Sequence, residues 1–188
     1  LIRKMDMEGI DKSVLLPLVN PENLDFYAAA GNQECLEACR RYPDRLMTFC
    51  NIDPRNMLNF KKGNIRKLIS AYKQLGCIGI GEICASLPVD HRLYRNLFHA
   101  AQEERMPMLF HFVSGRNINY GVIDDLHLPR LTKVLEEFPD AIFIGHSPCF
   151  WNEIDGGLTE EQRNSYPSGP IRKRGALWEL FDKYPNLY

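Results

Sequence analysis

The chain has 188 residues, and its 23 Lys and Arg residues nearly balance its 24 Asp and Glu residues, which gives a formal net charge of −1. This length is enough for one domain with a sizeable core. A near-neutral chain without a block of like charge argues against electrostatic binding to nucleic acid or to an anionic membrane. No apolar run approaches the roughly 20 residues that span a bilayer.

Strand and helix patterns alternate along almost the whole chain. The first half predicts a short helix at 1–8, a strand at 14–19, a helical stretch at 23–41 that 31–32 could break, a strand at 46–50, a helix at 56–75 and a strand at 77–83. The second half predicts a helix at 92–104, a strand at 106–113, a helix at 128–138, a strand at 141–145, a helix at 174–183 and a strand that begins at 185. The strands are continuous apolar runs, which is typical of parallel strands covered on both faces.

The connecting segments indicate how these elements are arranged. Links from helix to strand are short, whereas two links from strand to helix are long, at 114–127 and 148–173. Long loops at the C-terminal ends of strands favour a (β/α) barrel with its site at that end. An open doubly wound sheet is the competing architecture, but no glycine-rich phosphate loop follows any strand.

Three predicted strands end in a potential metal ligand: Glu82, His111 and His146. Each is separated from the next by about one strand-plus-helix unit, so successive parallel strands would bring them to one end of the sheet. A carboxylate and two imidazoles suit Zn²⁺ or a similar divalent ion. The alternatives are a satisfied core position for each histidine, and a salt bridge to an arginine for the carboxylate.

The loops after these strands supply further candidates. Arg116 could bind a substrate carboxylate, or it could be solvated. Trp151 could form the apolar wall of a substrate pocket, or pack the loop down. Asp53 could face the site, but we expect it to cap the next helix. Asp124 and Asp125 form a short acidic pair that we expect to be solvated.

The cysteines and the chain ends carry two more expectations. The six cysteines form no CxxC pair, and several lie in apolar strand-like runs, where a reduced core thiol is typical. We therefore expect a reducing, cytoplasmic environment. The sequence begins with Leu1 and ends with Tyr188 inside an incipient strand, which predicts a fragment of a longer chain.

Four motifs in succession resemble the amidohydrolase superfamily, in particular its amidohydrolase-2 branch of metal-dependent TIM-barrel hydrolases and decarboxylases. They are Gly-Ile-Gly-Glu82, Pro107-Met-Leu-Phe-His111, Phe143-Ile-Gly-His146-Ser147 and Lys183-Tyr-Pro-Asn-Leu-Tyr188. The resemblance makes His111 the metal ligand of barrel strand five and His146 the strand-six histidine, a ligand or a catalytic group near the metal. It places Glu82 at the strand-four position, where related branches have a metal-contacting carboxylate or lysine.

The sequence departs from that family at both ends. It contains no His-x-His pair for strand one, and nothing follows Tyr188 to supply the aspartate of strand eight. We therefore expect residues 1–188 to form a single partial domain, an incomplete (β/α)8 barrel of the TIM type with about strands two to seven. Such a chain would be inactive alone.

The resemblance implies a function for the complete protein. It is a metal-dependent hydrolase of a small-molecule amide, ester or lactone, with zinc as the expected cofactor. The first alternative is a non-oxidative decarboxylase, a lyase in which Arg116 anchors the substrate carboxylate. The second is a non-catalytic barrel fragment that binds a partner, and its open strand edges would favour association into homo-oligomers.

Overall fold

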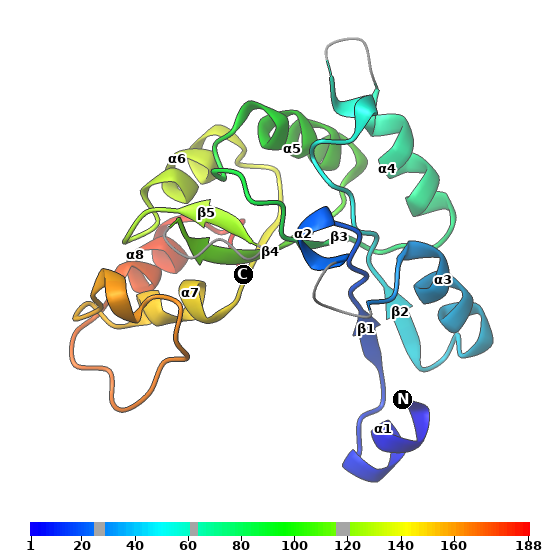
Figure 1. Ribbon diagram of the computed structural model, residues 1–188, viewed down its shortest axis with the longest axis horizontal. Helices are drawn as coiled ribbons and strands as arrows, with labels where there is room; N and C mark the ends of the chain where they lie inside the picture. The colour runs from blue at the N-terminus through cyan, green and yellow to red at the C-terminus, as the bar shows by residue number, and fades with distance from the viewer. Residues whose placement is uncertain (25–28, 61–63, 116–120) are drawn as a thin grey trace.

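The computed structural model describes residues 1–24, 29–60, 64–115 and 121–188. Strands and helices alternate, and helices α3, α4, α5, α6 and α8 lie in an arc around the strands (Figure 1). The first half of the chain contains α1 (Ile2–Glu8), β1 (Ser13–Leu15), α2 (Pro21–Leu24), α3 (Asn32–Arg41), β2 (Leu46–Thr48), the 3-10 helix η1 (Met57–Asn59), α4 (Ile65–Gln74) and β3 (Ile80–Ile83). The second half contains α5 (Arg92–Glu104), β4 (Met108–Ser114), β5 (Val122–Asp124), α6 (Pro129–Glu137), β6 (Phe143–His146), α7 (Pro148–Trp151), η2 (Asn152–Ile154), η3 (Glu160–Gln162) and α8 (Ala176–Lys183).

Apart from the short β5, which pairs with the end of β4, the strands follow one another in space in the same order as in the chain. β1 pairs with β2, β3 with β4, and β4 with β6, in parallel each time. Parallel bridges from Cys50 to Ile80 and from Phe143 to Leu187 join these pairs into one succession. A doubly wound sheet would reverse its strand order at a switch point. The unreversed parallel order is that of an incomplete TIM-type barrel, as the sequence predicts.

Several elements are shorter than their patterns predict. β1 stops before Pro17, which has no N–H to donate to a ladder. The stretch at 23–41 is divided, with Gly31 as the N-cap of α3. The predicted helix at 56–75 consists of η1 and α4, and the side chain of Asn64 caps α4 by accepting from the N–H of Lys67. The loop predicted at 114–127 contains β5, which pairs with the end of β4.

The core lies between the strands and the helices that cover them. The ring of Phe98, on α5, meets Phe110, Phe138 and Phe143 edge to face at centroid distances of 5.7, 5.5 and 5.3 Å. Such pairs contribute about 0.5–1.5 kcal/mol each beyond the area they bury. None of the helices in the described ranges is both long enough and apolar enough to cross a membrane.

Candidate metal centre

Glu82, His111 and His146 meet on three adjacent strands: Glu82 and His146 lie at the C-terminal ends of β3 and β6, whereas His111 lies in the middle of β4, which continues to Ser114. His111 and His146 are register partners in the β4–β6 ladder, and Ile83, the residue after Glu82, is paired with Phe110 in the β3–β4 ladder. One ligand atom from each of the three side chains lies within 4.8 Å of the other two. The predicted convergence of these three side chains is therefore present in the structure.

A carboxylate oxygen lies at the centre of this triad. Glu82 Oε1 is 2.6 Å from His111 Nδ1 and 3.3 Å from His146 Nε2. Burial alone would raise the pKa of the Glu82 carboxyl, but hydrogen bonds from His111 and His146 lower it to about 2. An ionised carboxylate only accepts hydrogen bonds, so His111 Nδ1 is the donor. In a neutral ring protonated at Nδ1, Nε2 carries the lone pair.

These donor atoms fit a divalent ion. Two ligand atoms each about 2.1 Å from a tetrahedral zinc ion lie about 3.4 Å apart. The 3.3 Å between Glu82 Oε1 and His146 Nε2 matches that separation, whereas the 2.6 Å to His111 Nδ1 is a direct hydrogen bond. Two arrangements satisfy the donor set. Either all three side chains are ligands, or Glu82 orients His111 through Nδ1 while Nε2 of that ring faces the ion.

Glycines beside the ligands allow aromatic rings to pack close to the strands. A Cβ on Gly79 would lie 2.5 Å from the ring of Phe49, and a Cβ on Gly145 would overlap the ring of Phe150. Neither glycine has a positive φ angle, so their role is close approach rather than backbone freedom. The ring of Phe150 therefore lies against β6 directly before His146.

An ion-pair cluster occupies the ends of β1 and β2 at the same end of the sheet. Arg55 bonds Glu22 at 2.6 Å and Asp53 at 2.6 Å, and Asn20 donates to Asp53 at 3.1 Å. Burial alone would raise the pKa of Glu22, but the hydrogen bond and charge of Arg55 lower it. The expected helix cap at Asp53 is wrong, because its carboxylate accepts from the main-chain N–H and the guanidinium of Arg55 instead.

Two other predicted positions have different outcomes. Arg116 lies outside the described residues, so its role stays a prediction. Trp151 is 43% exposed, and its ring contacts are with Phe150 and Phe181 on the helix side. Among the contacts described, none joins Trp151 to the triad, and its substrate role also stays a prediction.

The acidic pair Asp124 and Asp125, at the end of β5, is not uniformly solvated. Asp124 is 1% exposed, which contradicts the expectation for that residue, and it caps the start of α6 by accepting from the N–H groups of Arg130 and Leu131. Its chain neighbour Asp125 has a side chain that is 62% exposed. A carboxylate five residues before the first residue of a helix is not a common capping pattern, so the sequence carries no signal for this cap.

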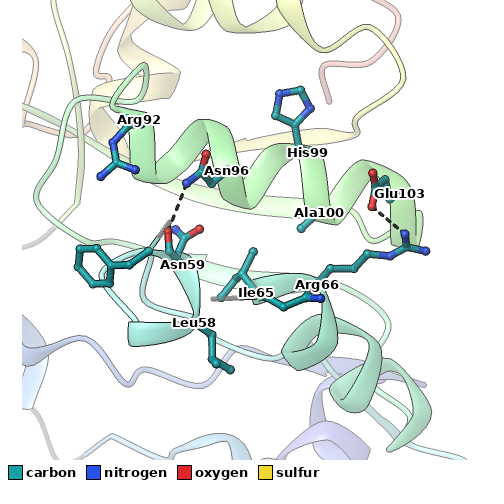
Figure 2. Close-up of a pocket in the computed structure, with 11 residues that line it drawn as sticks. Leu58, Asn59, Ile65, Arg66, Arg92, Asn96, His99, Ala100 and Glu103 are labelled. Carbon is teal, nitrogen blue, oxygen red and sulfur yellow. Dashed lines mark hydrogen bonds and ion pairs between the residues drawn. The ribbon is translucent and has the colours of Figure 1, made fainter. Parts of the chain in front are cut away.

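One large hollow lies away from the triad. A hollow of about 660 Å³ lies in the helix layer, between η1, α4 and α5, and Figure 2 shows its lining side chains. Its wall includes Asn59, Arg66, Asn96 and His99, but none of the three strand-end ligands. We locate the candidate chemistry at the triad, because the convergent donors and the lowered carboxyl pKa are there.

The sequence matches no protein-family model and no curated protein. Solved structures of the same fold are more informative. The chain is 20% identical to an uncharacterized TIM-barrel protein from Bordetella bronchiseptica, with a TM-score of 0.60, over 100% of this chain and 56% of that one. It is 15% identical to 5-carboxyvanillate decarboxylase from Sphingomonas paucimobilis, with a TM-score of 0.58, over 99% of this chain and 62% of that one.

A third solved structure is 5-carboxyvanillate decarboxylase from Novosphingobium aromaticivorans, described with bound manganese and a substituted nitrobenzoic acid. It is 18% identical, with a TM-score of 0.54, over 99% of this chain and 61% of that one. Likenesses at this level of identity show the fold, an α/β barrel of the TIM type. The chain spans 56% to 62% of the length of these three proteins, which agrees with an incomplete barrel.

Proposed function

We propose that Glu82, His111 and His146 form part of a divalent-metal centre in an enzyme that acts on a small organic substrate. The observation that carries this proposal is the convergence of a carboxylate and two imidazoles, within 4.8 Å of one another, on adjacent parallel strands where β3 and β6 end. In barrels of this type the active site lies at that end. The resemblance of the motifs around these residues to the amidohydrolase superfamily supports the same conclusion.

Each side chain has a distinct task in this proposal. A bound divalent ion would polarise a substrate oxygen and lower the pKa of a bound water. His111 holds the ion, and its ring orientation is fixed by the 2.6 Å hydrogen bond to Glu82. The side chain of His146 is 48% exposed against 15% for His111, so it is the one that can also reach a substrate and donate to a developing oxyanion.

Two reactions are compatible with this centre in the complete protein. Hydrolysis of an amide, ester or lactone is the reaction predicted from the motifs. Non-oxidative decarboxylation of an aromatic acid is the second candidate, and it is favoured by the naming of two of the solved structures above as 5-carboxyvanillate decarboxylases. The manganese in one of them makes Mn²⁺ a candidate ion beside Zn²⁺. Arg116 remains the proposed anchor of a substrate carboxylate, and Trp151 the proposed wall of its pocket.

Metal binding by this chain tests the centre directly. The protein is stripped of metal and titrated with Mn²⁺ and with Zn²⁺ by calorimetry, alone and as the variant His111→Ala. We expect the variant to bind about tenfold more weakly or worse, because it loses a ligand rather than an outer partner. The control is His99→Ala, an exposed imidazole on α5 that contacts Phe138. Equal affinities for the wild type and His111→Ala would refute the assignment.

A product assay separates the two reactions. The full-length protein, loaded with each ion, is incubated with hydroxylated benzoates and with a panel of esters, lactones and amides. Release of CO₂ supports the decarboxylase, and cleavage of the panel supports the hydrolase. If the protein holds the ion but does neither, the remaining alternative is a non-catalytic barrel that binds a partner, and chromatographic measurement of its oligomeric state follows.

A further inference from the structure

Asn51 joins the main chains of three successive strand ends. It follows β2 and is 2% exposed. Its side-chain Nδ2 donates to the carbonyl oxygen of Glu82 at 2.5 Å and to that of Pro17, which follows β1, at 2.9 Å. A single buried amide group therefore links the end of β1 to the main chain of the carboxylate at the centre of the triad.

The orientation of Asn51 is itself fixed from the helix layer. The N–H of Asn51 donates to Asn32 Oδ1 at 2.7 Å, and Asn32 Nδ2 donates back to the carbonyl oxygen of Asn51 at 2.9 Å. Asn32 Nδ2 also donates to the hydroxyl of Tyr72, on α4, at 3.0 Å. The side chain of Asn32 thus holds the main chain of Asn51, and the side-chain amide of Asn51 donates to the main chain after β1 and to Glu82 at the end of β3.

The ladder between β3 and β4 is irregular where Glu82 lies. Ile80 is paired with Met108 and Ile83 with Phe110, so two residues on β3, Gly81 and Glu82, lie opposite one residue on β4. Such a bulge redirects a side chain and interrupts regular pairing, and it is common beside active sites. The main chain of Glu82 therefore depends on a contact from outside this ladder, and Asn51 supplies one.

We propose that Asn51 is a positioning residue that fixes the main chain of Glu82 and thereby aims its carboxylate at His111 and the bound ion. This inference rests on the proposed metal centre. Partners behind a metal ligand set its orientation, and their removal weakens metal binding by about 10- to 100-fold. In this proposal Asn51 acts through Glu82, because its side-chain Nδ2 donates to the carbonyl oxygen of Glu82 and not to a triad side chain.

The chain contains a matched control for Asn51. Asn59, in η1, is also 2% exposed, and its Nδ2 also donates to two main-chain carbonyls, those of Pro54 and Leu93, at 2.7 Å each. In both residues the side-chain Oδ1 is buried without a hydrogen-bond partner among the described residues. Asn59 lies in the wall of the helix-layer hollow (Figure 2), and neither of the hydrogen bonds described for its side chain reaches the triad. The two residues therefore have similar burial and hydrogen bonding, but only Asn51 donates to the main chain of a triad residue.

The experiment compares Asn51→Ala and Asn51→Asp with Asn59→Ala. The aspartate keeps the shape of Asn51 but offers no donor to Glu82. Mn²⁺ affinity is measured by calorimetry, and in metal-free protein the Nδ1–H proton of His111 is followed by NMR, with His111→Ala as the assignment standard. We expect both Asn51 variants to weaken Mn²⁺ binding by about tenfold or more, and to shift or abolish the His111 resonance. Asn59→Ala should lower thermal stability but change neither the Mn²⁺ affinity nor the His111 resonance.

The outcomes separate this inference from the proposed function. If the Asn51 variants leave Mn²⁺ affinity and the His111 resonance unchanged, or if Asn59→Ala alters them equally, the positioning role is overturned. If the wild type binds no Mn²⁺ while the Asn51 variants alone perturb the His111 resonance, the positioning of Glu82 stands and the metal centre fails.

Discussion

Replacement of Arg163 by methionine should destabilise the chain strongly. Arg163 is 0% exposed, and its two terminal nitrogens donate to the carbonyl oxygens of Asp124 and Asp125 at 3.0 Å each. Its Nε lies 3.5 Å from Oε1 of Glu153, whose side chain is also 0% exposed. The substitution therefore leaves two carbonyls without these donors and removes the cation from beside a buried carboxylate.

The size of the effect follows from these distances. Two opposite charges about 3.5 Å apart attract by roughly 5 kcal/mol at an effective dielectric constant of 20, before the cost of desolvation. Loss of one partner of a buried pair costs about 3–5 kcal/mol in practice. Because Glu153 still accepts from the N–H of His127 at 2.8 Å, we expect a loss near 3 kcal/mol, at the lower end of that range. The double variant Arg163→Met/Glu153→Gln should lose less than the sum of the single losses.

Urea unfolding at neutral pH measures these free energies, with the fluorescence of Trp151 and Trp178 as the signal. Trp178 lies close to the pair, because its indole N–H donates to the carbonyl of Ile154 at 3.0 Å. The surface control is Arg3→Met, which should change stability by about 0.5 kcal/mol at most. A loss below about 1 kcal/mol for Arg163→Met, or a double variant that loses the full sum, would refute the argument.

Two further predictions concern Asp124 and Gly145. Burial raises the pKa of Asp124 to about 6 from an ordinary 3.8, although main-chain N–H groups such as that of Leu131 act in the opposite direction. The folded state holds this proton more tightly than the unfolded chain, so stability should fall as pH rises from about 4 to about 6. Asp124→Asn should flatten that part of the curve in urea unfolding at several pH values, and an identical slope would contradict the prediction. Gly145→Ala puts a methyl group into the ring of Phe150, so it should cost about 1–3 kcal/mol, and an unchanged melting temperature would show that the ring moves aside.

The positions that sequence could predict are those governed by a repeating pattern. Glu82, His111 and His146 each lie in or at the end of an apolar strand run, and a parallel barrel brings these positions together whatever the loops do. The order of the strands follows from the same alternation, because a connection through one helix places consecutive strands side by side. The triad positions and the strand order can both be predicted even when the first and last residues of each strand are not.

The positions that sequence could not predict depend on contacts between side chains and the main chain of distant residues. Asn51 donates to carbonyls more than 30 residues away in either direction along the chain, and Asp124 caps a helix across a turn. Such contacts leave no periodic pattern, and the same asparagine or aspartate types are common in loops. β5 was missed for a different reason, since three residues paired with the end of a longer strand are too few to show alternation.

The arrangement of β4 explains why a charged centre can lie inside this fold. Phe110 and Phe112 are each 1% exposed, and their rings pack against Phe98 on α5 and Phe150 on α7. His111 lies between them in sequence, and because side chains alternate along a strand it projects from the opposite face, toward the ends of β3 and β6. The aromatic face stabilises the strand by apolar burial, and the inner face needs only that its charges be paired. Changes at Phe110 or Phe112 therefore act on folding, whereas a change at His111 acts on the triad.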